Sequence, residues 1–182
     1  MATGELIVRT TIWLALVLYA AGEIGRLRWR SGHADDAALA RGLSTVGCAL
    51  YLVHVLFAFG VFHGWSHADA YRSTAEQTEE LTGWRWGGGL FVNHLFTGVW
   101  LAELIAWWAK PGSYRIRAAW IDASVRFFFL FMVANGAVVF VGGAQRWLGL
   151  AIVALLVFGL FAEPVRRPQQ PGVAGDDFPP DE

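Results

Sequence analysis

Four histidines in the middle of the chain are the residues best suited to chemistry: His54, His63, His67 and His94. An imidazole can ligate iron, copper or zinc, and it can exchange a proton near neutral pH. His63 and His67 are four residues apart, so an unbroken helix would place both on one face, although the intervening Gly64 could end that helix. His54 precedes His63 by nine residues, about half a turn away around a helix, so these two point in opposite directions.

Two of these side chains, His54 and His94, could hold a haem between two helices. Bis-histidine ligation needs one imidazole from each of two helices and a cavity between them. We expect the two backbones to differ in membrane depth by roughly 6 Å, at 1.5 Å of rise per residue. Two imidazole side chains could span that difference, and small residues nearby could open a cavity. The sequence therefore allows a haem b cofactor without requiring one.

A second grouping could bind a transition metal near the rim of the protein: His63, His67 and His94 with Asp69. Imidazole and carboxylate ligands suit zinc, copper or iron. The alternative for each histidine is a packed side chain that hydrogen-bonds to a carbonyl group or to interfacial water. The chain contains no recognisable nucleophile motif and no phosphate-binding glycine loop, so whether it is an enzyme stays open.

Five apolar blocks must position these residues. A helix needs about 20 apolar residues to cross a bilayer, with roughly 17 as the lower limit, and strands with open edges cannot cross it. The sequence therefore predicts an all-α, polytopic membrane helix bundle with five transmembrane helices and a short extracytoplasmic interfacial helix. The predicted spans are about 6–25, 43–63, 89–109, 120–141 and 147–162, of which the last is marginal in length.

Composition supports one membrane domain, residues 1–163, followed by a tail. Hydrophobic residues make up 55% of the chain and charged residues 16%, well below the roughly 25% charged residues of soluble domains. The net charge of −1 argues against a nucleic-acid partner, and the lipid bilayer is the expected partner. The tail, 164–182, holds five of the six prolines and ends in acids, so we expect it to be disordered.

The arginines orient the predicted bundle. Nine basic residues follow the first, third and fifth blocks and share one side: Arg26, Arg28, Arg30, Arg41, Lys110, Arg115, Arg117, Arg166 and Arg167. The opposite side has four, namely Arg9, Arg72, Arg85 and Arg146. The positive-inside rule then places the N-terminus outside the cell and the C-terminus in the cytoplasm. The near-absence of lysine suggests a bacterial protein of the inner membrane.

The longest outer connection, 64–88, contains a helix pattern of its own. Ser66 followed by Asp69 is typical of a capping box, and Gly83 is a natural C-terminal stop. Ala68, Tyr71, Ala75 and Leu81 recur at helical spacing. We expect a helix over about 67–82 that lies on the outer surface, either as a simple cover of the bundle or as a lid over a site.

Charged residues inside the spans predict an ion pair toward the cytoplasmic side. Glu103 and Arg126 lie at similar depth in an antiparallel helix pair, and an unpaired charge there would cost several kcal/mol. The competing pair is Asp122–Arg126 at i, i+4, and Glu23 could join either cluster or meet Arg26. We interpret the charges as structural. A proton relay to the histidines would have only three intervening polar residues, Asn93, Thr97 and Asn135.

Three classes of function remain open from the sequence. The simplest is a non-enzymatic membrane subunit or scaffold, with other membrane proteins or further copies of the chain as partners. The second is a small haem b electron-transfer protein with histidine ligands from the second and third spans. The third is a metal-binding or enzymatic site beneath the outer loop.

Overall fold

The structure is a bundle of long helices. It is a computed structural model that describes residues 3–30, 33 and 35–161, and this described part contains no β-strand. The predicted tail, 164–182, lies outside the described residues. The elements in chain order are α1 (Thr3–Arg30), α2 (Asp36–His63), α3 (His67–Thr82), α4 (Gly89–Ala109), α5 (Pro111–Ile116), α6 (Ala119–Ala134), the π-helical turn η1 (Asn135–Val139) and α7 (Gln145–Phe161).

Four helical segments are long and apolar enough to cross a membrane: Thr3–Arg30, Asp36–His63, Gly89–Ala109 and Ala119–Val139, the last comprising α6 and η1. The protein is therefore an all-helical bundle of the membrane-embedded type, as the sequence predicts. α7 is equally apolar but shorter, at 17 residues, which is the lower limit for a crossing. A fifth crossing by α7 stays a prediction.

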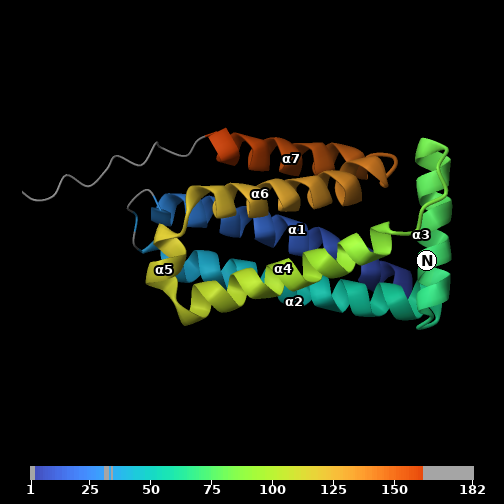
Figure 1. Cartoon of the computed structure of the whole chain (residues 1–182), viewed down its shortest axis with the longest axis horizontal. Helices are drawn as coiled ribbons and strands as arrows, with labels where there is room; N and C mark the ends of the chain where they lie inside the picture. The colour runs from blue at the N-terminus through green and yellow to red at the C-terminus, as the bar shows by residue number, and fades with distance from the viewer. Residues whose placement is uncertain (1–2, 31–32, 34, 162–182) are drawn as a thin grey trace, which may run out of the picture.

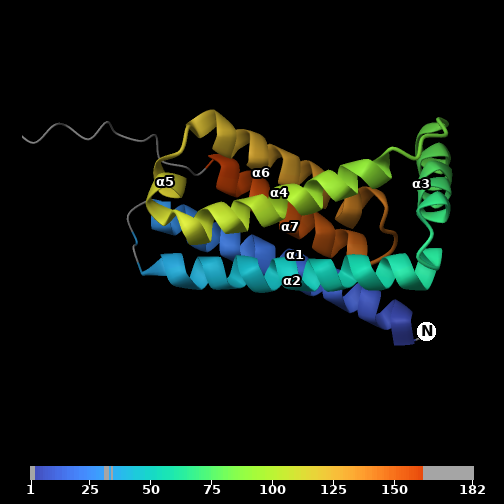
Figure 2. The same ribbon diagram turned by 60° about the horizontal axis from the view of Figure 1, so that its bottom comes forward.

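The long helices run along one axis, and α3 does not. Figure 1 shows α3 lying across one end of the bundle, nearly perpendicular to the other helices, and the short α5 at the opposite end. We name these the α3 end and the α5 end. The N-terminus of α1 and the connection between η1 and α7 lie at the α3 end, and α4 diverges from α2 toward it (Figure 2).

The first two helices pack closely because small residues line their contact. A Cβ atom added at Gly22 would lie 2.5 Å from Ser44 Oγ, and one at Gly25 would lie 2.9 Å from the Cβ of Ala40. Such small-residue seams let two membrane helices approach each other without a bulky side chain between them. Both helices extend beyond the predicted spans of 6–25 and 43–63, and the extensions carry the arginines that follow the first apolar block.

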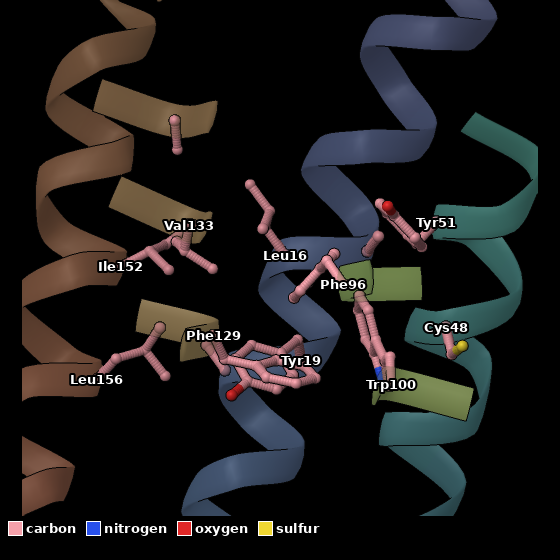
Figure 3. Packing of buried hydrophobic residues seen from close by; sticks show 13 residues of the cluster. Leu16, Tyr19, Cys48, Tyr51, Phe96, Trp100, Phe129, Val133, Ile152 and Leu156 are labelled. Carbon is pink, nitrogen blue, oxygen red and sulfur yellow. The ribbon is translucent and has the colours of Figure 1, made fainter. Parts of the chain in front are cut away.

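An aromatic cluster forms the middle of the bundle. Tyr19, Tyr51, Phe96, Trp100 and Phe129 are all buried, and they come from α1, α2, α4 and α6. Figure 3 shows the Tyr19 ring beside Phe129, with Trp100 on its other side. The same view shows Ile152 and Leu156 of α7 pointing toward α6. The burial of these rings supplies dispersion contacts, the main attraction between helices in lipid.

The surface helix α3 has the bounds that its local signals predict. Ser66 is its N-cap and accepts a hydrogen bond from the Asp69 backbone N–H at 3.2 Å, and Gly83 ends it with a φ of 76°. The packed face is rotated relative to the predicted one. Ala70 and Ala75 are buried, whereas Tyr71 of the predicted face stays 42% exposed. Gly87 of the loop that follows α3 lies against the edge of the Tyr71 ring.

Candidate functional site

A large hollow lies at the α3 end, between the membrane helices and beneath α3. It has a volume of about 650 Å³, within the roughly 300–1,000 Å³ typical of small-molecule sites. We call it the α3-end cavity. The polar side chains that line it come from α1, α2, α3, α4 and the first residue of α7: Arg9, Tyr51, His54, His63, Ser73, Thr74, Gln77, Asn93, His94, Thr97 and Gln145.

His54 has a fixed orientation in the wall of this cavity. Its Nδ1 lies 2.8 Å from the backbone carbonyl oxygen of Val8 on α1. A carbonyl group only accepts hydrogen bonds, so Nδ1 carries the proton and the neutral ring leaves Nε2 with a free lone pair. Imidazoles that ligate a metal or a haem iron are held in this way. His54 could therefore offer Nε2 to a ligand in the cavity.

His94 lines the same cavity from α4, as the haem hypothesis requires. Its ring stacks on that of His67 with 6.0 Å between centroids and 17° between planes. His67 in turn lies 4.8 Å from the ring of Phe59, and His63 lies 6.2 Å from the same ring. The structure thus brings His54 and His94 to one cavity and places His63 and His67 beside Phe59, with His94 stacked on His67.

The predicted metal grouping is not assembled. In the part of the chain that the structure describes, no three His, Cys, Asp or Glu side chains lie close enough to hold a metal ion. α2 ends at His63 and α3 begins at His67, because Gly64 and Trp65 both take left-handed backbone angles between them. The two histidines therefore do not share a helix face, and Asp69 pairs with Arg72 instead.

A chain of hydroxyl groups in the cavity wall was missed by the sequence analysis. Tyr51 OH lies 3.0 Å from Thr97 Oγ1, and the Thr97 hydroxyl also lies 3.0 Å from the backbone carbonyl of Asn93. Asn135, by contrast, donates to the Phe131 carbonyl of its own helix at 2.8 Å. In the sequence, Tyr51 stands out only as a tyrosine inside an apolar block.

The π-helical turn η1 shapes the cavity from the α6 side, since Gly136 and Ala137 line it. A π-turn inserts one residue into a helix and is frequent at functional sites. It also turns the carbonyl of Ala137 toward α7, where a Cβ added at Gly149 would lie 2.1 Å from the Ala137 oxygen. Glycine at 149 is thus what allows α7 to pack against this turn.

A network of buried charges occupies the α5 end. We call it the α5-end network, and its members are Glu23, Arg26, Arg30, Glu103, Arg117, Asp122 and Arg126. Asp122 is its shared partner. Its carboxylate lies 2.9 Å from Arg26, 2.6 Å from Arg117 and 3.4 Å from Arg126, and it also pairs with Arg30. Charges inside a bundle need such partners because burial removes their water.

The structure gives both members of the predicted Glu103–Arg126 pair other partners. Glu103 accepts hydrogen bonds from Arg117 at 2.6 Å and from the Tyr114 hydroxyl at 2.8 Å. Arg126 lies 3.0 Å from Glu23 and pairs with Asp122, the competing i, i+4 partner. A direct contact between Glu103 and Arg126 stays a prediction. Arg117 was not predicted as a partner of Glu103, because it is the short helix α5 that returns the chain to the bundle at this residue.

The groups that α5 brings to this network have shifted pKa values. Burial raises the pKa of the Tyr114 hydroxyl above its ordinary range, and the nearby Glu103 carboxylate also raises it. Burial alone would lower the pKa of the Arg117 guanidinium, but its hydrogen bonds to Glu103 and Asp122 raise the pKa above the usual value. Tyr114 is therefore neutral and Arg117 charged throughout the physiological range.

A small chamber of about 30 Å³ lies inside the α5-end network. It has room for about one or two water molecules. Tyr19, Glu23, Glu103 and Trp107 are among its walls. The buried Nε1–H of Trp107 has no hydrogen-bond partner among the described residues, so a water in the chamber would satisfy it. We call this the α5-end chamber.

The comparisons with known proteins give no relative. The chain matches no family, and no curated protein or solved structure shows detectable similarity to it.

Proposed function

We propose that the protein binds a small, lipid-soluble molecule in the α3-end cavity, with α3 as the cover of the site. The observation that supports this function most is the cavity itself, with about 650 Å³ between four membrane helices and α3. A bundle that served only as a scaffold would gain packing energy by filling such a space. Retention of the space, with polar groups placed around it, favours a ligand.

The lining predicts the chemistry of that ligand. The aromatic rings of Trp13, Phe96 and Phe140 offer flat apolar surfaces, which suit a ring system or an acyl chain. His54 Nε2, Asn93 and Thr97 offer hydrogen bonds from two helices, and Arg9 adds one positive charge. A mostly apolar molecule with a polar or anionic group fits this lining.

Haem b is the second candidate, and one observation favours it. The Nδ1 contact with Val8 presents His54 in the tautomer that ligates iron through Nε2. His94 lines the same cavity as the potential second ligand, and Arg9 could pair with a haem propionate. In this version the protein is a small electron-transfer protein, with His54 and His94 as axial ligands.

The proposed location is the bacterial inner membrane, with the α3 end outside the cell and the α5 end toward the cytoplasm. The arginine and lysine distribution supports this orientation through the positive-inside rule. The N-terminus would be extracytoplasmic and the C-terminus cytoplasmic, provided that α7 crosses the membrane. Fusion of a reporter enzyme to each terminus tests it, because both termini on one side would exclude five crossings.

The test of the function is to identify what the cavity holds. The full chain is purified in mild detergent, its absorption spectrum is recorded, and bound molecules are identified by native mass spectrometry. A Soret band that is lost in His54→Ala and kept in His33→Ala, an exposed loop histidine, would establish haem. A colourless protein with a stoichiometric organic ligand would establish the broader function.

A matched pair of glycine variants controls for damage to the fold. Gly136 lines the cavity and Gly98 does not, yet a Cβ at either position meets no atom within 4 Å. Gly136→Leu should displace the ligand and Gly98→Leu should retain it. An empty wild-type cavity in the presence of native lipid extract would refute ligand binding. It would leave the subunit or scaffold role, with membrane proteins or further copies of the chain as partners.

A further inference from the structure

One side chain lines two hollow spaces of the bundle. Trp100 lines both the α3-end cavity and the α5-end chamber, and it is only 3% exposed. The cavity occupies the α3 end and the chamber lies within the charged α5 end. The indole therefore stands in the wall between a polar space at one end of the bundle and a charged space at the other.

The aromatic cluster holds this indole in place. The Trp100 ring lies 5.4 Å from Tyr19, 5.3 Å from Tyr51 and 5.6 Å from Phe129, measured between ring centroids. Figure 3 shows these rings side by side across the middle of the bundle. Apolar constrictions of this kind gate a path by excluding water.

We propose that the α3-end cavity and the α5-end chamber are two halves of one path across the bundle, closed here by Trp100, and that protons pass along it. Ionisable groups buried within membrane helices commonly mark ion and proton pathways. The proposal uses the cavity as an entrance that water fills when no ligand occupies it, and it does not depend on which ligand binds there.

Polar groups approach Trp100 from both sides. On the cavity side the exposed Asn93 and His94 lead to the Thr97 hydroxyl, which contacts Tyr51 OH at 3.0 Å. On the chamber side the wall includes Tyr19 and Glu23 and continues to Glu103, whose side chain is 18% exposed.

Transfer along this path is a series of hydrogen-bond exchanges. Each water or hydroxyl group that accepts a proton from one side releases one to the other. No group changes its charge or oxidation state over a full cycle, and no co-reactant is needed.

The size and charge of the chamber decide which species can pass. A space of about 30 Å³ holds one or two waters, so a hydrated metal cation does not fit. The described part of the α5-end network has four arginines (Arg26, Arg30, Arg117 and Arg126) and three carboxylates (Glu23, Glu103 and Asp122), which also disfavours cations. Three carboxylates in turn oppose free passage of anions. A proton passes between hydrogen-bonded groups, so it does not need the space of a hydrated ion, and the carboxylates of Glu23 and Glu103 in the chamber wall can accept its charge.

The experiment measures proton entry into vesicles that contain the full chain and a pH-sensitive dye, after an external acid step. Trp100→Ala should increase the initial rate severalfold over wild type. Phe96→Ala and Phe129→Ala remove similar buried rings, but each lines only one of the two spaces. Neither should increase the rate comparably. If Trp100→Ala does not purify as a folded protein, Trp100→Leu, which removes less of the side chain, replaces it in the comparison with the Phe96 and Phe129 variants.

A second substitution distinguishes a proton path from nonspecific leakage through a gap in the bundle. Tyr19→Phe keeps the ring and removes the hydroxyl of a residue that lines the chamber, so it should slow proton entry when combined with Trp100→Ala. Equal rates for the Trp100, Phe96 and Phe129 variants would overturn the proposal, as would an unchanged rate in the double variant. Flux that depends on external chloride and not on the pH step would overturn it too. Ligand binding is measured in a separate experiment, so neither outcome of the proton assay decides whether the proposed function is correct.

Discussion

His54 on α2 is tied to Val8 on α1 by a hydrogen bond of 2.8 Å between the imidazole Nδ1 and the backbone carbonyl oxygen. Val8 is itself buried, and its carbonyl is already the i−4 acceptor within α1. The contact thus fixes one imidazole tautomer and also fastens two helices at the edge of the α3-end cavity. Substitution of His54 therefore tests both the stability of the protein and its ligand binding.

Substitution of His54 by Phe should destabilise the protein and remove ligand binding together. A neutral hydrogen bond contributes about 0.5–1.5 kcal/mol, so we expect a modest decrease in the unfolding temperature. His54→Gln keeps a donor that can reach a carbonyl, and it should recover part of the stability without restoring ligation through an imidazole. Thermal unfolding in detergent and ligand occupancy, measured on the same samples, distinguish the two effects. A His54→Phe variant with unchanged stability would mean that the Val8 contact contributes little.

Local signals explain which elements could be predicted from the sequence. α3 runs over the predicted residues because Ser66, Asp69 and Gly83 act within one helical turn of its ends. α1 extends beyond its predicted span, and a non-local contact stabilises the extension. Arg26 is stabilised by Asp122, which lies 96 residues later in the chain, and no window of sequence contains both partners.

The candidate site was predictable in its residue types and not in its geometry. His54 and His94 were selected as polar residues inside apolar blocks, and they share a cavity. The i, i+4 spacing of His63 and His67 does not place them on one helix face, because Gly64 ends α2, as the sequence allowed, and both Gly64 and Trp65 have a positive φ. A positive φ at a tryptophan is rare, so the turn at Trp65 was not predictable.

Asp122→Asn should be the most destabilising single change in the α5-end network. The substitution removes the carboxylate that four arginines share, and loss of one partner of a buried ion pair costs about 3–5 kcal/mol. Asp36→Asn is the matched control. Asp36 pairs with Arg28 at the surface, where an ion pair contributes only about 0–1 kcal/mol. Thermal unfolding of both variants should show a large decrease for Asp122→Asn and little for Asp36→Asn, and equal effects would refute the central role of Asp122.

Gly149→Ala should loosen α7 from the π-turn. The added methyl group would lie 2.1 Å from the Ala137 carbonyl oxygen, so the backbone of one helix must move. Overpacking of this kind costs about 1–3 kcal/mol. Gly98→Ala meets open space and should be tolerated or slightly stabilising, since alanine favours helix more than glycine. Limited proteolysis and thermal unfolding would reveal the difference, and a Gly149→Ala protein as stable as the wild type would show that α7 does not pack as described.

High pH should destabilise the α5 end through Tyr114. Burial raises the pKa of its hydroxyl in the folded state above the value of about 10 in an unfolded chain. A raised folded-state pKa contributes stability that is fully present below the unfolded value and is lost as the pH rises through the folded value. The unfolding temperature should therefore decrease above about pH 10. Tyr114→Phe loses the hydrogen bond to Glu103, so it should start from a lower unfolding temperature and decrease less over the same range. The unfolding temperatures of the two proteins are compared from about pH 9 to about pH 11, a range centred on the usual tyrosine pKa. If both decrease with the same slope, ionisation of Tyr114 is not what destabilises the wild type.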